Sequence, residues 1–211
     1  MTLLLAAVLA AAVAAAGGPM CPAGFRPVQS AAPLSSNGCG AAGMNIKVDT
    51  GGVELAECCD VHDACYSMCG VPKAECEKEF KQCMETKCRQ APTEAAKSSC
   101  KQGAAMYAMG AAMMGQQFYD DAQAAGCTCV KAGDAAAVRA AYAPHLERVV
   151  ANSPPSDATR GKRVDRDAQL AAALAKLADR KNANKEGQLL LRFVRRAPGS
   201  IQRDAGHGGE L

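Results

Sequence analysis

The stretch of the chain with the most obvious potential for chemistry is residues 57–70, ECCDVHDACYSMCG. It places His62 next to Asp63 and surrounds the pair with four cysteines, Cys58, Cys59, Cys65 and Cys69. A histidine and four cysteines this close together could form a metal cage. They could also be a catalytic base on a helix that disulfides hold rigid. The compartment in which the chain folds decides between these hypotheses, because free thiols persist only under reducing conditions.

The N-terminal residues predict that the chain is secreted. Residues 3–16 form an uncharged apolar run, which is short for a membrane anchor, since about 20 apolar residues are needed to span a bilayer as a helix. Ala14, Ala15 and Ala16 precede Gly17 in the small-residue pattern of a cleavage site. We therefore expect a signal peptide at residues 1–16, with an uncleaved anchor as the alternative. The mature chain is then extracellular and lacks a transmembrane segment.

The twelve cysteines all lie between Cys21 and Cys129. An even number of closely spaced cysteines in an oxidising compartment indicates disulfides, here six. The charge also divides along the chain: residues 1–130 carry 9 Lys and Arg against 12 Asp and Glu, a net −3, whereas residues 131–211 carry 15 against 9, a net +6. We expect a disulfide-rich domain at residues 17–130 and a basic C-terminal tail at residues 131–211 that is partly helical or disordered.

Helical periodicity and helix breakers place the candidate residues on the first of three expected helices. These cover residues 53–69, 73–90 and 93–125. The only plausible strand signal is GMNIKVDT at residues 43–50. The domain is therefore expected to be mainly α.

The tail holds two expected amphipathic helices, at residues 134–152 and 165–181, with a linker between them. We expect KEGQLLLRFVRRAP, residues 185–198, to be a solvated basic segment, with contact to an anionic membrane as the alternative. The final residues, 197–211, have the composition of a disordered segment.

The helix that carries His62 and Asp63 gives them different directions. Residues four apart share a face, so Cys58, His62 and Tyr66 form one row, and the neighbouring Asp63 projects about 100° away. We therefore expect His62 to act as a base and Asp63 to act separately, as a hard oxygen ligand suited to Ca²⁺. The Gly-rich segment NGCGAAG, residues 37–43, could supply carbonyl oxygens, and a Cys39–Cys59 disulfide would bring it beside Asp63.

The stretch CCDVHDACYSMCG resembles the X-C-C-x-x-H-D-x-C-Y signature of secreted phospholipases A2. CPAGFRPV near the mature N-terminus, NGCG before the site and CEKEFKQC after it are most similar to the group XII branch. The resemblance covers residues 21–129 and leaves out the tail. It implies an all-α, disulfide-rich fold with two long antiparallel helices linked by disulfides, and a Gly-rich calcium loop.

The resemblance also implies an activity, the calcium-dependent hydrolysis of the sn-2 ester of glycerophospholipids at a membrane or micelle surface. His62 would be the general base that activates water, while Ca²⁺ polarises the ester carbonyl. Glu77 takes the position of the carboxylate that supports the histidine, and Tyr66 that of the tyrosine that holds this carboxylate. The implied calcium ligands are Asp63 and the carbonyl groups of Gly38, Gly40 and Ala42.

Two positions depart from the family pattern. The loop reads C-G-A-A-G instead of C-G-x-G-G, so Gly43 is an alternative ligand, and Glu77 stands where the family usually has Asp. Because a misplacement of about 1 Å can cost a large factor in rate, the longer Glu77 side chain is compatible with low activity. A weakly active or non-catalytic member of the same fold, which binds lipid or a receptor, is therefore the first alternative function.

Other interpretations of the same residues stay open at this point. A structural zinc domain built from Cys58, Cys65, Cys69 and His62 is the second alternative, although these spacings lack the C-x₂-C pairs of zinc sites. The charged face around Glu77 could simply be solvated. The methionines at positions 106, 109, 113 and 114 fit a lipid-binding surface or, the interpretation that we favour, a core-facing stripe. We expect a monomer that binds no nucleic acid, since the basic tail lacks interleaved aromatic residues.

Overall fold

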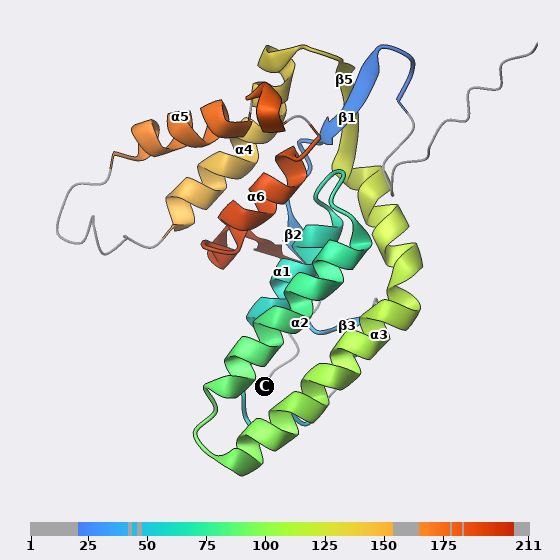
Figure 1. Cartoon of the computed structure of the whole chain (residues 1–211), viewed down its shortest axis with the longest axis vertical. Helices are drawn as coiled ribbons and strands as arrows, with labels where there is room; N and C mark the ends of the chain where they lie inside the picture. Colours follow the sequence, from blue (N-terminus) through green and yellow to red (C-terminus); the bar gives the residue numbers. More distant parts are fainter. Residues whose placement is uncertain are drawn as a thin grey trace, which may run out of the picture.

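The computed structural model describes residues 21–41, 44–45, 48–153, 165–177, 179–182 and 184–204 (Figure 1). The expected signal peptide at residues 1–16 lies outside these residues, and so do the loop residues Ala42 and Gly43.

Three helices form the frame of the N-terminal half: α1 (Ala56–Tyr66), α2 (Lys73–Arg89) and α3 (Glu94–Gly126). Disulfides join α1 to α2 at Cys58–Cys83 and at Cys65–Cys76. Since residue numbers rise along α1 while those of their partners fall along α2, the two helices are antiparallel. The long helix α3 then runs back alongside α2 (Figure 1). This confirms the expected mainly α, disulfide-rich fold.

All twelve cysteines are paired, and none is free. Besides the two bridges between α1 and α2, the pairs are Cys21–Cys129, Cys39–Cys59, Cys69–Cys127 and Cys88–Cys100. The zinc-domain alternative is wrong, because cysteines in disulfides cannot serve as thiolate ligands.

Helix α1 ends at Tyr66, three residues earlier than expected, because two buried glutamines hold the chain that follows it in a turn. Gln29 donates to the carbonyl of Ser67 and accepts from the N–H of Cys69. Gln123 donates to the carbonyls of Tyr66 and Met68 and accepts from the N–H of Gly70, which has a φ of 74°. Both glutamines thereby satisfy backbone groups that the end of a helix leaves without partners.

The strands are short and do not follow the sequence-based expectation. β1 (Phe25–Gln29) pairs antiparallel with β5 (Cys127–Lys131), from Phe25 opposite Lys131 to Gln29 opposite Cys127. β3 (Gly40–Ala41) pairs with β4 (Met44–Asn45), which alone falls within the expected strand at residues 43–50. The expectation that no other segment is a strand was wrong, because β1 and β5 are brought together by the long-range Cys21–Cys129 bridge and not by local propensity.

The tail contains the two expected helices, α4 (Ala135–Asn152) and α5 (Arg166–Leu177), and a third, α6 (Glu186–Val194). Residues 180–182 and 198–200 form 3-10 turns, and β6 (Gln202–Arg203) pairs in parallel with β2 (Ser35–Ser36). The expectations of a solvated segment at residues 185–198 and of disorder up to residue 204 were therefore wrong. The physical reason is burial: Leu189, Leu190, Leu191 and Val194 of α6 are all less than 9% exposed.

Two apolar clusters form the core. The larger cluster joins Val28 of β1 and Val61 of α1 to tail residues such as Leu146 and Leu190, so the tail packs on the same core as the site helix. The smaller cluster lies between the N-terminal part of α1, the C-terminal half of α2 and the N-terminal part of α3. It includes Leu55, Phe80 and Met84 together with several cystines. The domain boundary at residue 130 stays a prediction. Among the described residues, no helix has the length and apolar character needed to cross a membrane.

Candidate active site

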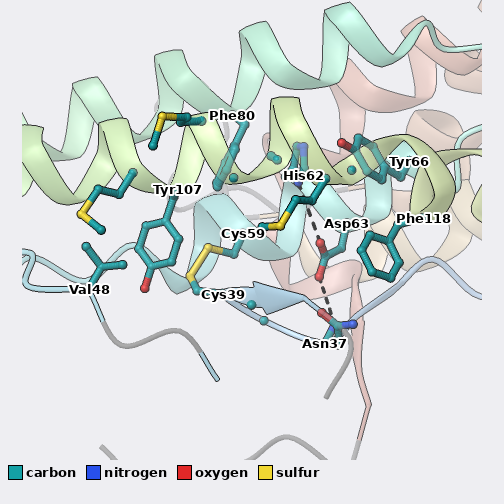
Figure 2. Close-up of a pocket in the computed structure, with 18 of the residues that line it drawn as sticks. Asn37, Cys39, Val48, Cys59, His62, Asp63, Tyr66, Phe80, Tyr107 and Phe118 are labelled. Carbon is teal, nitrogen blue, oxygen red and sulfur yellow. Dashed lines mark hydrogen bonds and ion pairs between the residues drawn. A yellow bond between two sulfur atoms is a disulfide. The ribbon is translucent and has the colours of Figure 1, made fainter. Parts of the chain in front are cut away.

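A pocket of about 430 Å³ opens beside α1, between the loop that contains Asn37 to Gly40 and the middle of α3 (Figure 2). Figure 2 shows His62 and Asp63 between the α3 side and the loop, with Phe80 beside His62. The lining is mostly apolar, and its titratable groups, His62, Asp63, Tyr66 and Tyr107, are few. An apolar cavity with a few convergent polar groups is the usual form of a small-molecule binding site.

His62 is 7% exposed, and two aromatic rings fix its orientation. Its imidazole stacks on Phe80, at 4.4 Å between ring centroids, and touches Tyr66 at the same distance with a tilt of 54°. Nε2 lies 3.5 Å from Oε1 of Glu77, and Nδ1 lies 3.9 Å from Oδ1 of Asp63. The distance of 3.9 Å is too long for a hydrogen bond, which agrees with the expectation that His62 and Asp63 point in different directions and act separately.

Glu77 joins α2 to the histidine through a single oxygen. Oε1 accepts a hydrogen bond from the hydroxyl of Tyr66, pairs with Nζ of Lys73 at 2.9 Å and faces His62. Although burial acts to raise it, the contacts with His62, Tyr66 and Lys73 lower the pKa of Glu77 to about 2. The side chain is therefore a negative charge beside the imidazole at neutral pH.

Tyr66 can approach Glu77 because α3 presents a glycine at this level. A Cβ on Gly115 would lie 2.5 Å from the Tyr66 hydroxyl and 3.4 Å from Cε of Lys73. Burial and the hydrogen bond to Glu77 raise the pKa of Tyr66 far above its ordinary value, so the hydroxyl stays a proton donor. The structure thus brings together the three residues for which the sequence suggested catalytic roles, His62, Tyr66 and Glu77.

Asp63 points from α1 to the Gly-rich loop. Its Oδ2 accepts hydrogen bonds from the Ser36 hydroxyl at 3.0 Å and from the N–H of Asn37 at 3.1 Å. Its Oδ1 receives no hydrogen bond from the residues that the structure describes, and faces the pocket side of His62. Burial raises the pKa of Asp63 to about 6, although His62, Ser36 and Asn37 act in the opposite direction.

The loop expected to supply carbonyl ligands lies against Asp63, tied down by the Cys39–Cys59 bridge. Gly38 and Gly40 line the pocket, whereas Ala42 and the alternative Gly43 lie outside the described residues. Gly38 has a φ of 84°, a left-handed conformation that favours glycine. Its carbonyl accepts the N–H of Gly40 at 3.0 Å, which closes a tight turn.

These residues could hold a hard cation, but not through side chains alone. In the part of the chain that the structure describes, no group of three or more His, Cys, Asp and Glu side chains is placed to hold a metal. Oδ1 of Asp63 offers one carboxylate oxygen that accepts no hydrogen bond from the described residues, and a glycine-rich loop beside it can turn backbone carbonyls toward the same point. A donor set of carboxylate and carbonyl oxygens fits Ca²⁺, which takes six to eight oxygen ligands in flexible geometry.

Sequence reasoning missed four polar residues that surround this site: Lys73 beside Glu77, and Ser36, Asp60 and Arg203 on the far side of Asp63. Lys73 could have been found, since it precedes Glu77 by four residues on one helix. Ser36 could also have been found, since it directly precedes the Gly-rich loop, but nothing local in the sequence relates Arg203 to the site, because its contact depends on the pairing of β2 with β6.

The methionines of α3 form the outer rim of the pocket and do not face the core. Met106, Met109, Met113 and Met114 are 50–76% exposed, and Phe118 is 42% exposed. All five line the pocket, so the interpretation of a core-facing stripe was wrong. The buried face of α3 consists of other residues, among them Ala104, Tyr119 and Gln123, so the methionines lie on the opposite face.

Comparison with known proteins decides the family. The family model described as Group XII secretory phospholipase A2 precursor matches residues 8–135, more than half of the chain. The chain belongs to the group XII secretory phospholipase A2 family. The matched residues contain helices α1 to α3, the histidine–aspartate pair and all six disulfides. Helices α5 and α6 and strand β6 lie beyond them.

Two curated relatives carry the name Group XIIA secretory phospholipase A2. The mouse protein is 31% identical over 101 residues, which are 46% of this chain and 53% of the relative. The human protein is 39% identical over 57 residues, 27% of this chain and 30% of the relative. The chain thus spans about half the length of the mouse relative and less of the human one. No solved structure matches the chain significantly.

Proposed function

We propose that the protein is a secreted, calcium-dependent phospholipase A2 that hydrolyses the sn-2 ester of glycerophospholipids to a fatty acid and a lysophospholipid. The observation that carries this proposal is the orientation of His62. Its Nε2 faces the ionised Glu77 at 3.5 Å, while its Nδ1 faces the pocket beside Asp63. Nε2 thus lies beside a carboxylate, and Nδ1 is directed to where a substrate would lie, as a general base requires.

In this mechanism Nδ1 of His62 takes a proton from a water molecule in the pocket as the water attacks the ester carbonyl. The imidazolium that forms is stabilised by the Glu77 carboxylate at Nε2, and Tyr66 and Lys73 hold that carboxylate in place. The proton then passes from Nδ1 to the leaving lysophospholipid oxygen. Ca²⁺, held by Asp63 and by carbonyls of Gly38, Gly40 and Ala42, would polarise the ester carbonyl and stabilise the charge on its oxygen.

The pocket suits a phospholipid at a membrane or micelle surface. Its walls are mostly apolar, and the methionine side chains at its rim are flexible and exposed. Methionine adapts to irregular apolar partners, so a rim of this kind can meet acyl chains of different shapes. The protein would act on this surface as a monomer from the extracellular side.

A specific observation supports a second candidate function, a weakly active or non-catalytic lipid-binding protein of the same fold. His62 Nε2 makes no well-aligned hydrogen bond among the described residues. Lys73 donates a hydrogen bond to Oε1 of Glu77, the same oxygen that lies nearest to His62. A carboxylate shared with a lysine supports an imidazolium less strongly than one that bonds the imidazole directly.

The experiment that tests the proposal is release of fatty acid from mixed phospholipid vesicles by the purified protein, in millimolar calcium and then in EGTA. We expect release that needs calcium and that His62→Gln lowers about 10²–10⁴-fold, the usual contribution of a general base. His145→Gln is the matched control, because His145 is also buried but lies outside the pocket, where it hydrogen-bonds the carbonyl of Ser30. Absence of release by the folded, fully oxidised protein would favour the second candidate function.

A further inference from the structure

The tail reaches the proposed calcium site through its last described strand. β6 pairs with β2 in parallel, with Ser36 opposite Arg203. Two backbone hydrogen bonds flank this position, from Gln202 N–H to the Leu34 carbonyl at 2.9 Å and from Asp204 N–H to the Ser36 carbonyl at 3.0 Å. The Gly-rich loop begins directly after Ser36, so β6 fixes the backbone from which that loop starts.

The side chain of Arg203 makes a second connection, to α1. Its Nε and Nη2 contact Oδ2 of Asp60 at 2.9 Å and 2.5 Å. The Asp60 side chain is only 7% exposed, so its charge needs a partner. Since Asp60 lies one helical turn before Asp63, one residue of the tail ties the loop's starting strand to the helix that carries the calcium-binding carboxylate.

Ser36 carries this connection to the site itself. Its hydroxyl lies 2.8 Å from Oδ1 of Asp60 and 3.0 Å from Oδ2 of Asp63. A hydroxyl has one proton to donate, so the two carboxylates compete for it. Arg203 bonds Oδ2, the other oxygen of Asp60, and its positive charge weakens the attraction of Asp60 for the Ser36 proton. Asp63 then competes better for this proton, which would hold its Oδ2 against the loop strand and leave Oδ1 available to a cation.

We propose that Arg203 is a positioning residue for calcium binding, acting through Asp60 and Ser36 on Asp63; this inference rests on the proposed function. It assigns a role to the tail, which lies outside the residues that match the family model. Groups that orient the ligands of a metal commonly change its affinity 10–100-fold when they are replaced.

The test uses a charge-neutral double variant of the full chain, Asp60→Asn with Arg203→Gln. Loss of Arg203 alone would leave an unpaired carboxylate near the site, whose field attracts cations and masks the loss of positioning. The matched control is Glu79→Gln with Arg195→Gln, which removes the ion pair between α2 and the end of α6 with the same change in charge. Calcium affinity is measured by titration calorimetry, and hydrogen exchange at the Asn37 amide is measured without calcium.

We expect the Asp60/Arg203 variant to bind calcium about tenfold more weakly than the parent and to exchange the Asn37 amide faster, while the control changes neither. Unchanged affinity, or equal losses in both double variants, would overturn the inference. Should the double variant fail to fold, Arg203→Lys keeps the charge, removes the two-pronged contact and is expected to weaken binding in the same direction. A parent that binds no calcium would refute the proposed function, and Asn37 exchange would then show whether Arg203 still orders the loop.

Discussion

Helices α1 to α3 and helices α4 to α6 are held in place by different chemistry. Around α1, α2 and α3, the cluster of Leu55, Phe80 and Met84 is completed by cystines such as Cys58–Cys83 and Cys88–Cys100. Helices α4 to α6 contain no cysteine, and fully buried side chains such as Leu146, Leu177 and Leu190 hold them together. The first region is cross-linked, and the second depends on apolar burial.

This difference explains how the site can stand open. A cross-link stabilises a fold mainly by restricting the unfolded chain, so it does not require large side chains to be buried. Helix α3 can therefore direct its methionines outward around the pocket, while its opposite face contacts α1 and α2 through residues such as Gly115 and Tyr119 and through the Cys88–Cys100 disulfide. A region without disulfides could not leave so much apolar surface exposed and remain stable.

The largest expected effect on stability comes from the region without cross-links. Leu190→Ala removes a fully buried side chain from the larger core, and we expect a loss of about 2–5 kcal/mol in the free energy of unfolding. Denaturant unfolding measures the loss, and hydrogen exchange locates it. Amides of α6 should exchange faster, whereas α1, joined to α2 by two disulfides, should keep its protection. Equal acceleration in both helices would show that the two regions open as one unit.

A smaller effect, dependent on pH, is expected within the cross-linked region. The pKa of Glu77 is about 2 in the folded protein against 4.5 for an unperturbed side chain, so ionised Glu77 stabilises the fold above pH 4.5. Glu77→Gln should therefore destabilise the protein at pH 7. The shift from 4.5 to about 2 corresponds to about 3.4 kcal/mol at 1.36 kcal/mol for each pKa unit, and solvent screening of the half-buried carboxylate reduces the expected loss to about 2–3 kcal/mol. The difference between parent and variant should shrink as the pH falls from 4.5 toward 2. Denaturant unfolding at pH 7, 4.5 and 3 measures it, and a difference independent of pH would contradict the assigned contacts.

The smallest effect is expected at the pocket rim, where a substitution should change membrane binding and leave stability as it is. Met113 is 76% exposed, and Met113→Ser should weaken binding to phospholipid vesicles about fivefold, equivalent to about 1 kcal/mol of apolar transfer. Phe25→Ser is the matched control, since Phe25 is an exposed apolar residue on β1, away from the pocket. Sedimentation with vesicles measures the binding. Equal losses in both variants would mean that the rim has no special part in it.

His62 and Asp63 could be singled out from local spacing on one helix, whereas the roles expected for Tyr66 and Glu77 followed from the resemblance to the secreted phospholipase A2 signature. His62, Asp63 and Tyr66 fall within one α-helix, and Glu77 follows directly after a cysteine that bonds to that helix. Local periodicity also gave the start of α2 at Lys73 and placed α3 and α4 within a residue or two. Local sequence thus placed these residues on their helices, and the family resemblance was needed to relate Glu77 to His62.

The remaining features depend on contacts between distant residues, which no local pattern encodes. Helix α6 was missed because its basic residues suggested a solvated segment, whereas its leucines pack on α4 and β1. β2 and β6 are two residues each, too short for any strand signal. The exposure of the α3 methionines could not be read from spacing either, since the same stripe fits a core-facing helix and a pocket rim.

The parallel pairing of β2 with β6 also has a consequence for biosynthesis. All twelve cysteines precede Val130, so the six disulfides can form while the last helices are still being synthesised. Domains fold from the N-terminus as the nascent chain emerges, and contacts between residues far apart in sequence form late. Ser36 can pair with Arg203 only after residue 203 has been synthesised. A nascent chain can therefore be fully oxidised before it makes the contact between Arg203 and Asp60, and the role that we propose for this contact would begin only then.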